Sequence, residues 1–464
     1  MTPPAAIHAA VAPVQRLGPA GLRALEERLA PVRAGTTPIG RRVALSPILL
    51  PPSVTEALDG LGRATHVVLR EALDAARADP RFAARLWPGP RALARVGRRF
   101  GIRQAQWAAF GVPSFFAHHR VAQPDPVPRC RLDAFWIDGS PRVFELNVGA
   151  MLCSVMDGLA QASAEPLAAL VSGCAAPRAA DALAEALLRR HRARFGARPA
   201  RAAQLDHPGA RCGDADALVE ALRAKGVTAR RVPCGAVSFR RGRLEVDGEA
   251  ITLLSEESTA EPPPLALASA AERARYKLAR WRALTRGAAI VHPAPYEALF
   301  HKGFLALVSE GALRGVVDAE ALDALERHVA WTRRTTPEAV ASFEGDRAPL
   351  RELAIRHRAR LVLKPMIGHG GRGVVLGDRT PAERWTREVD AAIRARDAVL
   401  QERLTPPSLE LLLPGGRVVG AHADLSPVFV DGRLAAVFSR YDERGGLLRY
   451  LGGGGGLVPV WMAR

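Results

Sequence analysis

The pattern of apolar and polar positions divides this chain into a helical first part and a later part richer in strands. Apolar residues recur at helical spacing in Leu22–Ala30, Val54–Arg77 and Arg91–Phe110, and proline-rich joints separate these stretches. Residues 129–148 then alternate between apolar and polar side chains, which is the period of a strand with two unlike faces. The pattern predicts a helical N-terminal region, residues 1–125, ahead of a sheet-containing body.

The alternating segment predicts a β-hairpin. Its two strands are Arg131–Ile137 and Arg142–Asn147, and Asp138-Gly139 between them supplies the turn. An Asp-Gly pair is typical of tight hairpin turns because both residues tolerate positive φ angles. The hairpin opens a second segment, residues 126–200, which continues into helices.

The remaining patterns predict a mixed α/β body in two further segments. Residues 201–260 alternate between strand and helix, as a small β/α unit does, and residues 265–464 are rich in strands. The expected strands are 202–205, 227–232, a hairpin at 237–246, 288–292, 360–364, 374–376, 399–403, 418–425, 434–440 and 457–460. The expected helices are 165–195, 215–225, 270–285, one that carries Lys302, and 381–394.

Composition excludes several classes of protein. The net charge is +18, but the arginines are spread over the whole chain and no basic block is interleaved with aromatic residues, so we expect no nucleic-acid binding. No apolar run is long enough for a membrane span, and the first residues lack the pattern of a secretory signal. The five cysteines form no C-x-x-C pair, which fits a reducing cytoplasm.

Two scarce residue types mark candidate chemistry. The chain has a single asparagine, Asn147, and four lysines against 61 arginines. Such a composition replaces lysine with arginine wherever it can, so a retained lysine indicates a place where a compact point charge is needed. Two of the lysines are Lys302 and Lys364. An asparagine supplies a neutral carbonyl oxygen that a hard cation accepts as a ligand.

Lys364 stands at the end of an expected strand and leads into a glycine-rich loop with glycines at 368, 370, 371 and 373. Such a loop between two strands can fold over a polyphosphate and present backbone N–H groups to it. The spacing also fits G-x-G-x-x-G, but that dinucleotide motif leads into a helix, whereas this loop leads into a strand. The Gly-Lys-Ser/Thr ending of a P-loop is missing. A glycine-rich hairpin without a ligand remains an alternative.

The hairpin carries an oxygen-rich face. Glu145 and Asn147 are two residues apart and share a side of their strand, and Asp133 can face them from the other strand. Two carboxylates and one amide carbonyl suit Mg²⁺ together with nucleotide phosphates and water. Arg131 shares the face of Asp133 and could hold a phosphoryl group in transfer. The alternative is a solvated polar face of an edge hairpin.

Three further residues are candidates from their positions. Gln401 and Glu402 end a strand whose backbone could pair with an adenine edge, although many strands end in this way. Arg440 precedes the glycine run 452–456 and could bind phosphate or a substrate carboxylate.

Together these pieces resemble the circularly permuted ATP-grasp proteins, which include the synthetase domain of glutathionylspermidine synthetase and related peptide ligases. The resemblance covers residues 129–460, and its order is specific, because the Glu-x-Asn metal element comes first here and last in ordinary ATP-grasp enzymes. The matching pieces are Arg131-x-Asp133, Glu145-x-Asn147, Lys302, Trp331-Thr-Arg333, Lys364 with its glycines, Gln401-Glu402 and Arg440. Val148-Gly-Ala-Met151 departs from the polyamine synthetases, so their substrates do not carry over.

The resemblance implies a role for each matching residue. Asp133, Glu145 and Asn147 would hold Mg²⁺, and Arg131 would contact the transferring phosphate. Lys302, Lys364 and the loop glycines would bind the phosphates of ATP, and Gln401-Glu402 would meet adenine. The implied activity is an ATP-dependent ligase that joins a carboxylate substrate to an amine substrate through an acyl phosphate. A degenerate nucleotide-binding protein and a phosphotransferase remain alternatives.

Overall fold

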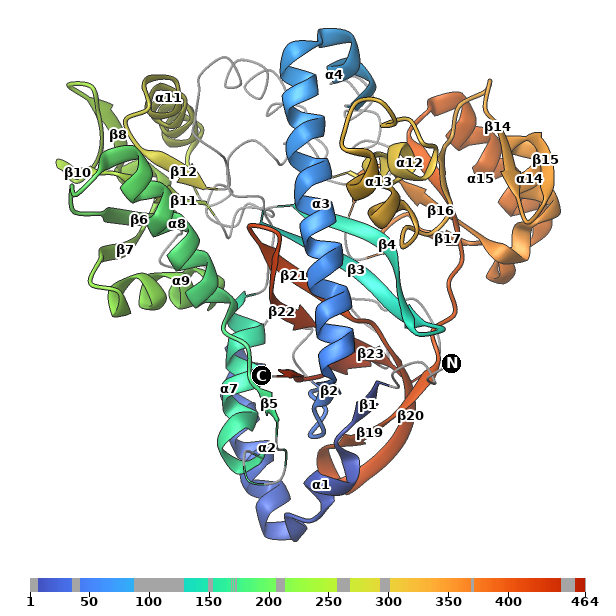
Figure 1. Cartoon of the computed structure of the whole chain (residues 1–464), viewed down its shortest axis with the longest axis horizontal. Helices are drawn as coiled ribbons and strands as arrows, with labels where there is room; N and C mark the ends of the chain where they lie inside the picture. The colour runs from blue at the N-terminus through green and yellow to red at the C-terminus, as the bar shows by residue number, and fades with distance from the viewer. Residues whose placement is uncertain are drawn as a thin grey trace.

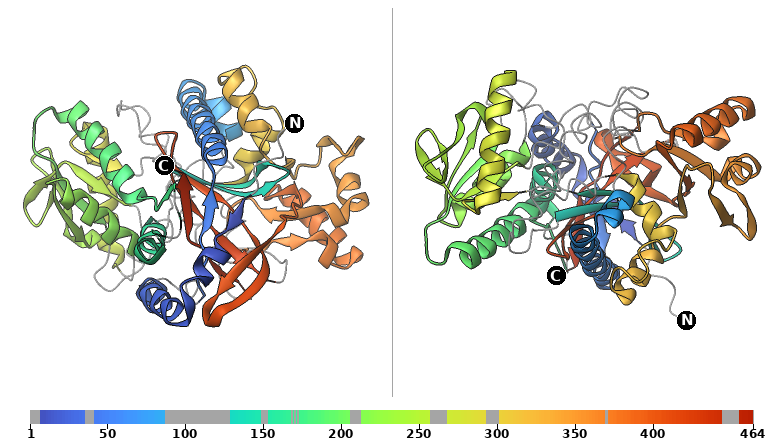
Figure 2. Two further views of the ribbon diagram at one scale, coloured as in Figure 1. Left: turned by 60° about the horizontal axis from the view of Figure 1, so that its bottom comes forward. Right: turned by 90° about the horizontal axis from the view of Figure 1, so that it is seen from above.

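The computed structural model describes residues 7–35, 42–86, 129–148, 153–167, 169, 171, 173–205, 213–256, 268–292, 301–368, 371–443 and 455–463. The molecule is a mixed α/β protein in which one unit lies on either side of a central sheet (Figure 1). The green and yellow unit is on one side and the orange unit on the other, and the turned views of Figure 2 show the same arrangement. The expected helix Arg91–Phe110 lies outside the described residues.

The central sheet is antiparallel with the strand order β22-β21-β3-β4. Its strands are β3 (Arg129–Ile137), β4 (Ser140–Val148), β21 (Ser426–Val430) and β22 (Arg433–Phe438). The long helix α3 (Pro52–Ala78) lies across this sheet, and its Val68 and Leu69 share a core with Leu132 and Phe429. Strands from residues 129–148 and 426–438 therefore meet in one sheet although they are far apart in sequence.

The predicted hairpin is confirmed. β3 and β4 pair from Ile137↔Ser140 to Cys130↔Val148, with a register shift between Asp133 and Ala134. Asp138 and Gly139 form the turn with φ angles of 51° and 76°, which explains why an Asp-Gly pair occupies these positions. The register places Asp133 directly opposite Glu145 and Arg131 directly opposite Asn147.

One flanking unit is built on a parallel sheet with the order β12-β11-β6-β7. Its strands and helices are β6 (Arg201–Leu205), β7 (Thr228–Val232), β11 (Leu253–Ser255), β12 (Ile290–His292), α8 (Ala179–Phe195), α9 (Gly213–Ala224) and α11 (Ala270–Arg286). Ala202 and Leu253 pack with α8 and α9, whereas Ala203 and Leu254 pack with α11. Helices thus cover both faces, as parallel sheets require.

A small antiparallel sheet extends this unit. It has the order β10-β9-β8, with β8 (Val237–Arg240), β9 (Arg243–Val246) and β10 (Glu249–Ile251). α11 begins with a capping box in which Ser269 and Glu272 exchange hydrogen bonds. The unit includes more of the chain than the expected segment 201–260, because α8, α11 and β12 belong to it.

The other flanking unit contains the expected glycine loop. Its four-stranded sheet has the order β13-β18-β16-β17. The strands are β13 (Thr332–Arg334), β16 (Leu361–Pro365), β17 (Val375–Leu376) and β18 (Ala398–Glu402). The hairpin and helices around it are β14 (Val340–Phe343), β15 (Asp346–Pro349), α14 (Leu350–Arg356) and α15 (Ala382–Ala395). Helices α12 (Lys302–Ser309) and α13 (Ala319–Glu326) join this unit to the central sheet.

Two more sheets bring the ends of the chain together. The first has the order β1-β2-β25-β5, with β1 (His8–Ala9), β2 (Ile48–Leu50), β5 (Cys174–Ala175) and β25 (Val460–Ala463). The second has the order β19-β20-β23-β24, with β19 (Ser408–Leu413), β20 (Arg417–Ala423), β23 (Arg440–Asp442) and β24 (Gly455–Leu457). The remaining helices are α1 (Val11–Gln15), α2 (Gly18–Gly35), α4 (Pro80–Leu86) and α7 (Cys153–Leu167). The N-terminal region therefore also contributes strands, and β2 pairs in parallel with β25.

Three expected elements differ in their limits. The expected helix 165–195 is interrupted, because α7 ends at Leu167 and α8 begins at Ala179. The expected strands 434–440 and 457–460 are each divided between two sheets. Gly455 lies in β24, where a β-carbon would meet the backbone oxygen of Tyr441 at 2.3 Å, so only glycine fits the close pairing. Among the helices that the structure describes, every one is too short or too polar to cross a membrane.

Candidate active site

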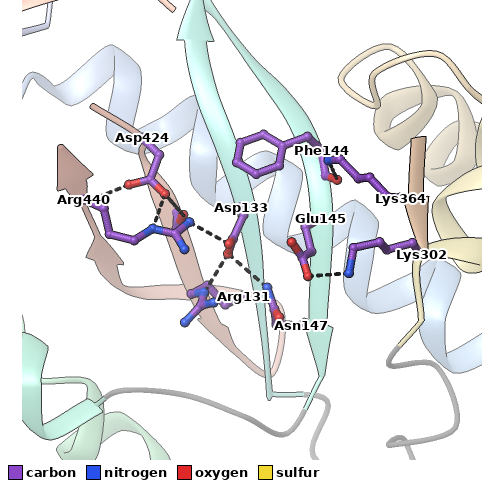
Figure 3. Close-up of polar contacts among 10 residues, drawn as sticks. Arg131, Asp133, Phe144, Glu145, Asn147, Lys302, Lys364, Asp424 and Arg440 are labelled. Atoms are coloured by element: carbon purple, nitrogen blue, oxygen red, sulfur yellow. Dashed lines mark hydrogen bonds and ion pairs between the residues drawn. The ribbon is translucent and has the colours of Figure 1, made fainter. Parts of the chain in front are cut away.

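The polar face of the β3–β4 hairpin gathers four of the residues singled out in the sequence. Arg131, Asp133, Glu145 and Asn147 lie on the same side of the two strands, because directly opposed residues of an antiparallel pair share a face (Figure 3). Arg131, Asp133 and Asn147 are at least nine-tenths buried. β4 is the edge strand of this sheet, but the alternative of a solvated face does not hold, because three of the four side chains are buried.

Asp133 is the centre of a buried charge network. Its Oδ1 accepts hydrogen bonds from Nε of Arg131 at 2.7 Å and from Nδ2 of Asn147 at 3.0 Å, and its Oδ2 accepts one from Nη2 of Arg440 at 2.7 Å. Burial raises the pKa of this carboxyl, but Arg131 and Arg440 outweigh burial and lower the pKa to about 2. Asp133 is therefore ionised at neutral pH.

Arg440 is held by a second carboxylate, which the sequence did not reveal. Asp424, which follows β20, accepts hydrogen bonds from the backbone N of Arg440 at 2.5 Å and from its Nε at 2.8 Å. Asp424 is completely buried, and burial raises the pKa of its carboxyl against the effect of Arg440. The guanidinium groups of Arg131 and Arg440 lie 5.1 and 5.4 Å from the centre of the Phe438 ring.

The two expected lysines lie beside β4, on the side of the hairpin away from Arg440 (Figure 3). Lys302 is the first residue of α12, and its Nζ donates to Oε1 of Glu145 at 2.9 Å and to the backbone oxygen of Gly368 at 2.7 Å. Lys364 is on β16, and its Nζ donates to Oε1 of Gln401 at 2.5 Å and to the backbone oxygen of Phe144 at 3.4 Å. Burial lowers the pKa of Lys364 to about 8, and the nearby Glu145 limits the fall.

The glycine loop after Lys364 has the backbone that its sequence predicts. Gly368, Gly371 and Gly373 have φ angles of 155°, 73° and 71°, which side chains other than glycine rarely adopt. Gly370 lies outside the described residues. The backbone oxygen of Gly368 contacts Lys302, so the loop and both lysines belong to one region of the molecule.

Gln401 and Glu402 are the last two residues of β18, in agreement with the expected strand end. β18 is an interior strand between β13 and β16, and the backbone N–H groups of Glu402 and Arg403 donate to Trp331 and Arg360 at 2.8 Å. These two N–H groups are therefore paired within the protein, and the role of Gln401 and Glu402 toward adenine stays a prediction. The Gln401 side chain links Lys364 to Thr332, and the Glu402 carboxylate accepts from Arg142 at 2.8 Å.

The oxygens that could bind a metal ion lie on both strands of the hairpin. Both carboxylate oxygens of Asp133 accept hydrogen bonds from cationic or amide groups, and its role as a metal ligand stays a prediction. Within the described ranges, Oε2 of Glu145 and the carbonyl oxygen of Asn147 accept no hydrogen bond, and no group of three His, Cys, Asp or Glu side chains is arranged for a metal. Glu145 and Asn147 fit a Mg²⁺ ion that takes its other ligands from nucleotide phosphates and water.

Comparison with known proteins supports the fold. No protein-family model matches the chain, and no curated protein matches it in sequence. The apo structure of a glutathione synthetase-like effector from Globodera pallida has a TM-score of 0.60 and 12% identity, over 95% of this chain and 97% of that chain. A crystal structure described as a provisional gamma-glutamylcysteine synthetase, from Methylobacillus flagellatus KT, has a TM-score of 0.36 and 12% identity over 76% and 82% of the two chains, which is too low to support an argument.

The first of these likenesses covers almost the whole of both chains, so this chain has a glutathione synthetase-like fold. The prediction of a synthetase-like α/β fold is confirmed at that level. The permuted order of the fold and the role of each site residue stay predictions.

We expect the free energy of unfolding to depend on pH through the carboxyl group of Asp133. Its folded pKa of about 2 is below the unfolded value of 3.8, so the carboxylate contributes about 2 kcal/mol above pH 4, and this contribution is lost as the pH falls toward 2. Urea unfolding of the wild type and Asp133→Asn at pH 5 and pH 3 measures the difference. The free energy of unfolding should fall less with acid in the variant. An equal fall in both proteins would contradict the charge network.

Proposed function

We propose that this protein is an ATP- and Mg²⁺-dependent ligase that joins a carboxylate to an amine through an acyl phosphate. The observation that carries the proposal is the convergence of Lys302, Lys364 and the glycine loop on the Glu145 end of the hairpin. Lysine is rare in this chain, and two of its four lysines meet here. The synthetase-like fold agrees with this activity, and the position of Glu145 and Asn147 ahead of both lysines supports the permuted ATP-grasp order that we propose.

The lysines support a polyanion as the ligand at this end. Lys364 is 8% exposed, and within the described residues its amine donates only to an amide oxygen and a backbone oxygen. Burial of a cation beside neutral acceptors is costly, and the lowered pKa of Lys364 reflects that cost. The phosphates of ATP would supply the negative charge that this amine lacks, and the strained glycine loop would supply backbone N–H groups.

In the proposed reaction, a substrate carboxylate oxygen attacks the γ-phosphorus of ATP, the bond to ADP breaks, and an acyl phosphate forms. The substrate amine then attacks the acyl carbon and loses a proton, and inorganic phosphate leaves as the amide forms. Lys302 and Lys364 would offset the phosphate charge, and Arg131 would stabilise the transferring group. Glu145 and Asn147 would hold Mg²⁺, which would supply positive charge to offset that of the phosphates.

The network around Asp133 suits the positioning that this chemistry needs. Asp133 and Asp424 fix the guanidinium of Arg440, and Asp133 fixes that of Arg131. Two immobilised guanidinium groups beside the phosphate end can orient a substrate carboxylate toward the γ-phosphoryl group. We therefore assign Arg440 to the carboxylate substrate and Arg131 to the phosphoryl group.

We expect the Glu145–Lys302 pair to be required for turnover and an exposed pair of the same chemistry to be dispensable. Lys225 and Glu185 are also 2.9 Å apart, but Glu185 is exposed and the pair is remote from the hairpin. Lys302→Met should weaken ATP binding at least tenfold, and Glu145→Gln should raise the Mg²⁺ concentration for half-maximal ADP release about tenfold or more. Calorimetry of ATP binding and an ADP-release assay measure these effects.

Lys225→Met and Glu185→Gln are the matched controls, and both should behave as the wild type does. Equal ATP affinity in Lys302→Met and the wild type would overturn the assignment of the phosphate site. ATP binding without ADP release under any substrate would favour the degenerate nucleotide-binding protein. A stable phosphorylated product would favour the phosphotransferase.

Removal of the Lys364 charge should stabilise the protein while it destroys ATP binding. The folded pKa of about 8 lies below the unfolded value of 10.5, so the charged amine costs about 3 kcal/mol at pH 7, and the cost disappears as the pH rises between these values. Lys364→Met avoids the cost but loses the Gln401 hydrogen bond, so the free energy of unfolding should rise by about 1–2 kcal/mol without nucleotide. Denaturation with and without ATP tests both parts, with Lys225→Met as control. A fall in stability would contradict the account of Lys364.

A further inference from the structure

Three polar side chains form a row across the parallel sheet of the green and yellow unit. Figure 1 shows β6, β11 and β12 in this unit. Ser255 on β11 is in register with Gln204 on β6 and with His292 on β12, so the three residues share one face of the sheet. Ser255 and His292 are the last residues of their strands, and Gln204 is the last but one. The row therefore lies at the carboxyl ends of parallel strands, where ligands bind in open α/β sheets.

The row is buried and its polar atoms are unused. Gln204, Ser255 and His292 are each 1–2% exposed. Among the described residues, Oε1 of Gln204, Oγ of Ser255 and Nε2 of His292 have no hydrogen-bond partner. Buried polar atoms are nearly always paired, so three unpaired atoms in one row indicate a missing ligand rather than a structural role.

The buried hydroxyl of Thr252, in the same unit, has the hydrogen-bond partners that buried polar groups usually have. Oγ1 of Thr252 is 2.8 Å from Nε2 of His191 and accepts from the backbone N of Arg201 at 3.1 Å. Thr252 is therefore a matched residue whose hydroxyl has partners within the protein.

The charges around the row limit the ligand. Burial and the charges of Arg129 and Arg190 lower the pKa of His292 far below its ordinary value, so its imidazole is neutral. Arg190 is paired with the Asp431 carboxylate, and the Arg129 guanidinium nearby disfavours a cationic ligand. Gln204 donates its Nε2 to the backbone oxygen of Leu205 at 3.1 Å, which leaves Oε1 as a bare acceptor that disfavours a carboxylate.

We propose that the row binds the uncharged carboxamide of a substrate of the ligase, so the proposal rests on the function given above. A carboxamide N–H can donate to Oε1 of Gln204, and its carbonyl can accept from the hydroxyl of Ser255. Arg129 links the row to the reacting end of the site. Its charge acts on His292, and it lies on β3 two residues before Arg131 and four residues before Asp133, on the same face as both. The substrate would extend from the hairpin to the parallel sheet.

Binding of small amides to the full-length protein without nucleotide tests the proposal. The probes are L-glutamine and L-asparagine, and L-glutamate and L-aspartate are their isosteric acids. Saturation-transfer NMR should show binding of the amides and not of the acids. Ser255→Ala and Gln204→Leu should each weaken amide binding about tenfold or more, because each removes one hydrogen bond to the ligand. Thr252→Val is the control and should leave amide binding unchanged.

Melting temperatures separate a ligand site from a structural role. Ser255→Ala should leave the melting temperature unchanged or raise it, since it removes an unpaired polar atom, whereas Thr252→Val should lower it. Gln204→Leu removes the unpaired Oε1 but also the hydrogen bond to Leu205, so it should lower the melting temperature less than Thr252→Val does. Equal binding of amides and acids, no binding of any probe, or a loss of melting temperature in the row variants as large as in Thr252→Val would overturn the proposal. The readout needs no ATP, so its failure is distinct from failure of the ligase assignment.

Discussion

The candidate site depends on one buried carboxylate between two guanidinium groups. Asp133 on β3 contacts Arg131 on its own strand and Arg440 on β23, which belongs to another sheet, and Asp424 completes the set. Removal of one member of such a set leaves an unpaired buried charge, at a cost of about 3–5 kcal/mol. The network therefore joins two sheets, and it also immobilises the two cations that we assign to substrate and phosphoryl group. The same network therefore stabilises the fold and positions the two guanidinium groups.

The two lysines beside β4 differ in how far their charge is compensated within the protein. Lys302 is paired with Glu145, but Lys364 is buried against neutral oxygens and Gln401. A protein without a need for this charge would be more stable with an apolar side chain at position 364. Retention of an unfavourable cation beside a glycine loop is understandable if an anionic ligand completes the site. The same reasoning applies to the unpaired row of Gln204, Ser255 and His292, where the missing partner is uncharged.

Local patterns predicted the parts of the site that lie close together in sequence. Alternation along residues 131–147 and the Asp138-Gly139 turn predict the hairpin and its register from Ile137↔Ser140 to Ala134↔Val143. The register shift after Asp133, which places Asp133 opposite Glu145, was not predicted by this pattern. The scarcity of lysine and asparagine directed attention to Asn147, Lys302 and Lys364. The helices α3, α11 and α15 and most strands followed from periodicity for the same reason, because each depends on its own residues.

Contacts between distant segments could not be predicted from these patterns. Asp424 is 16 residues from Arg440 and further still from Asp133, and nothing in its local sequence indicates burial. The interior position of β18, which turns the Gln401 side chain toward Lys364, depends on pairing with both β13 and β16. The second guanidinium group beside Asp133, that of Arg440, comes from a different sheet. Each of these features arises from the tertiary arrangement of sheets.

The acyl-phosphate step is the central claim, and the fate of carboxylate oxygen tests it most directly. The wild-type protein would be incubated with ATP, Mg²⁺ and pooled amino acids and short peptides whose carboxylates carry ¹⁸O, and mass spectrometry would follow phosphate and products. The account predicts that released phosphate gains one ¹⁸O atom per turnover and that a product appears one water lighter than its two precursors. Release of phosphate without ¹⁸O, together with no condensed product, would contradict it.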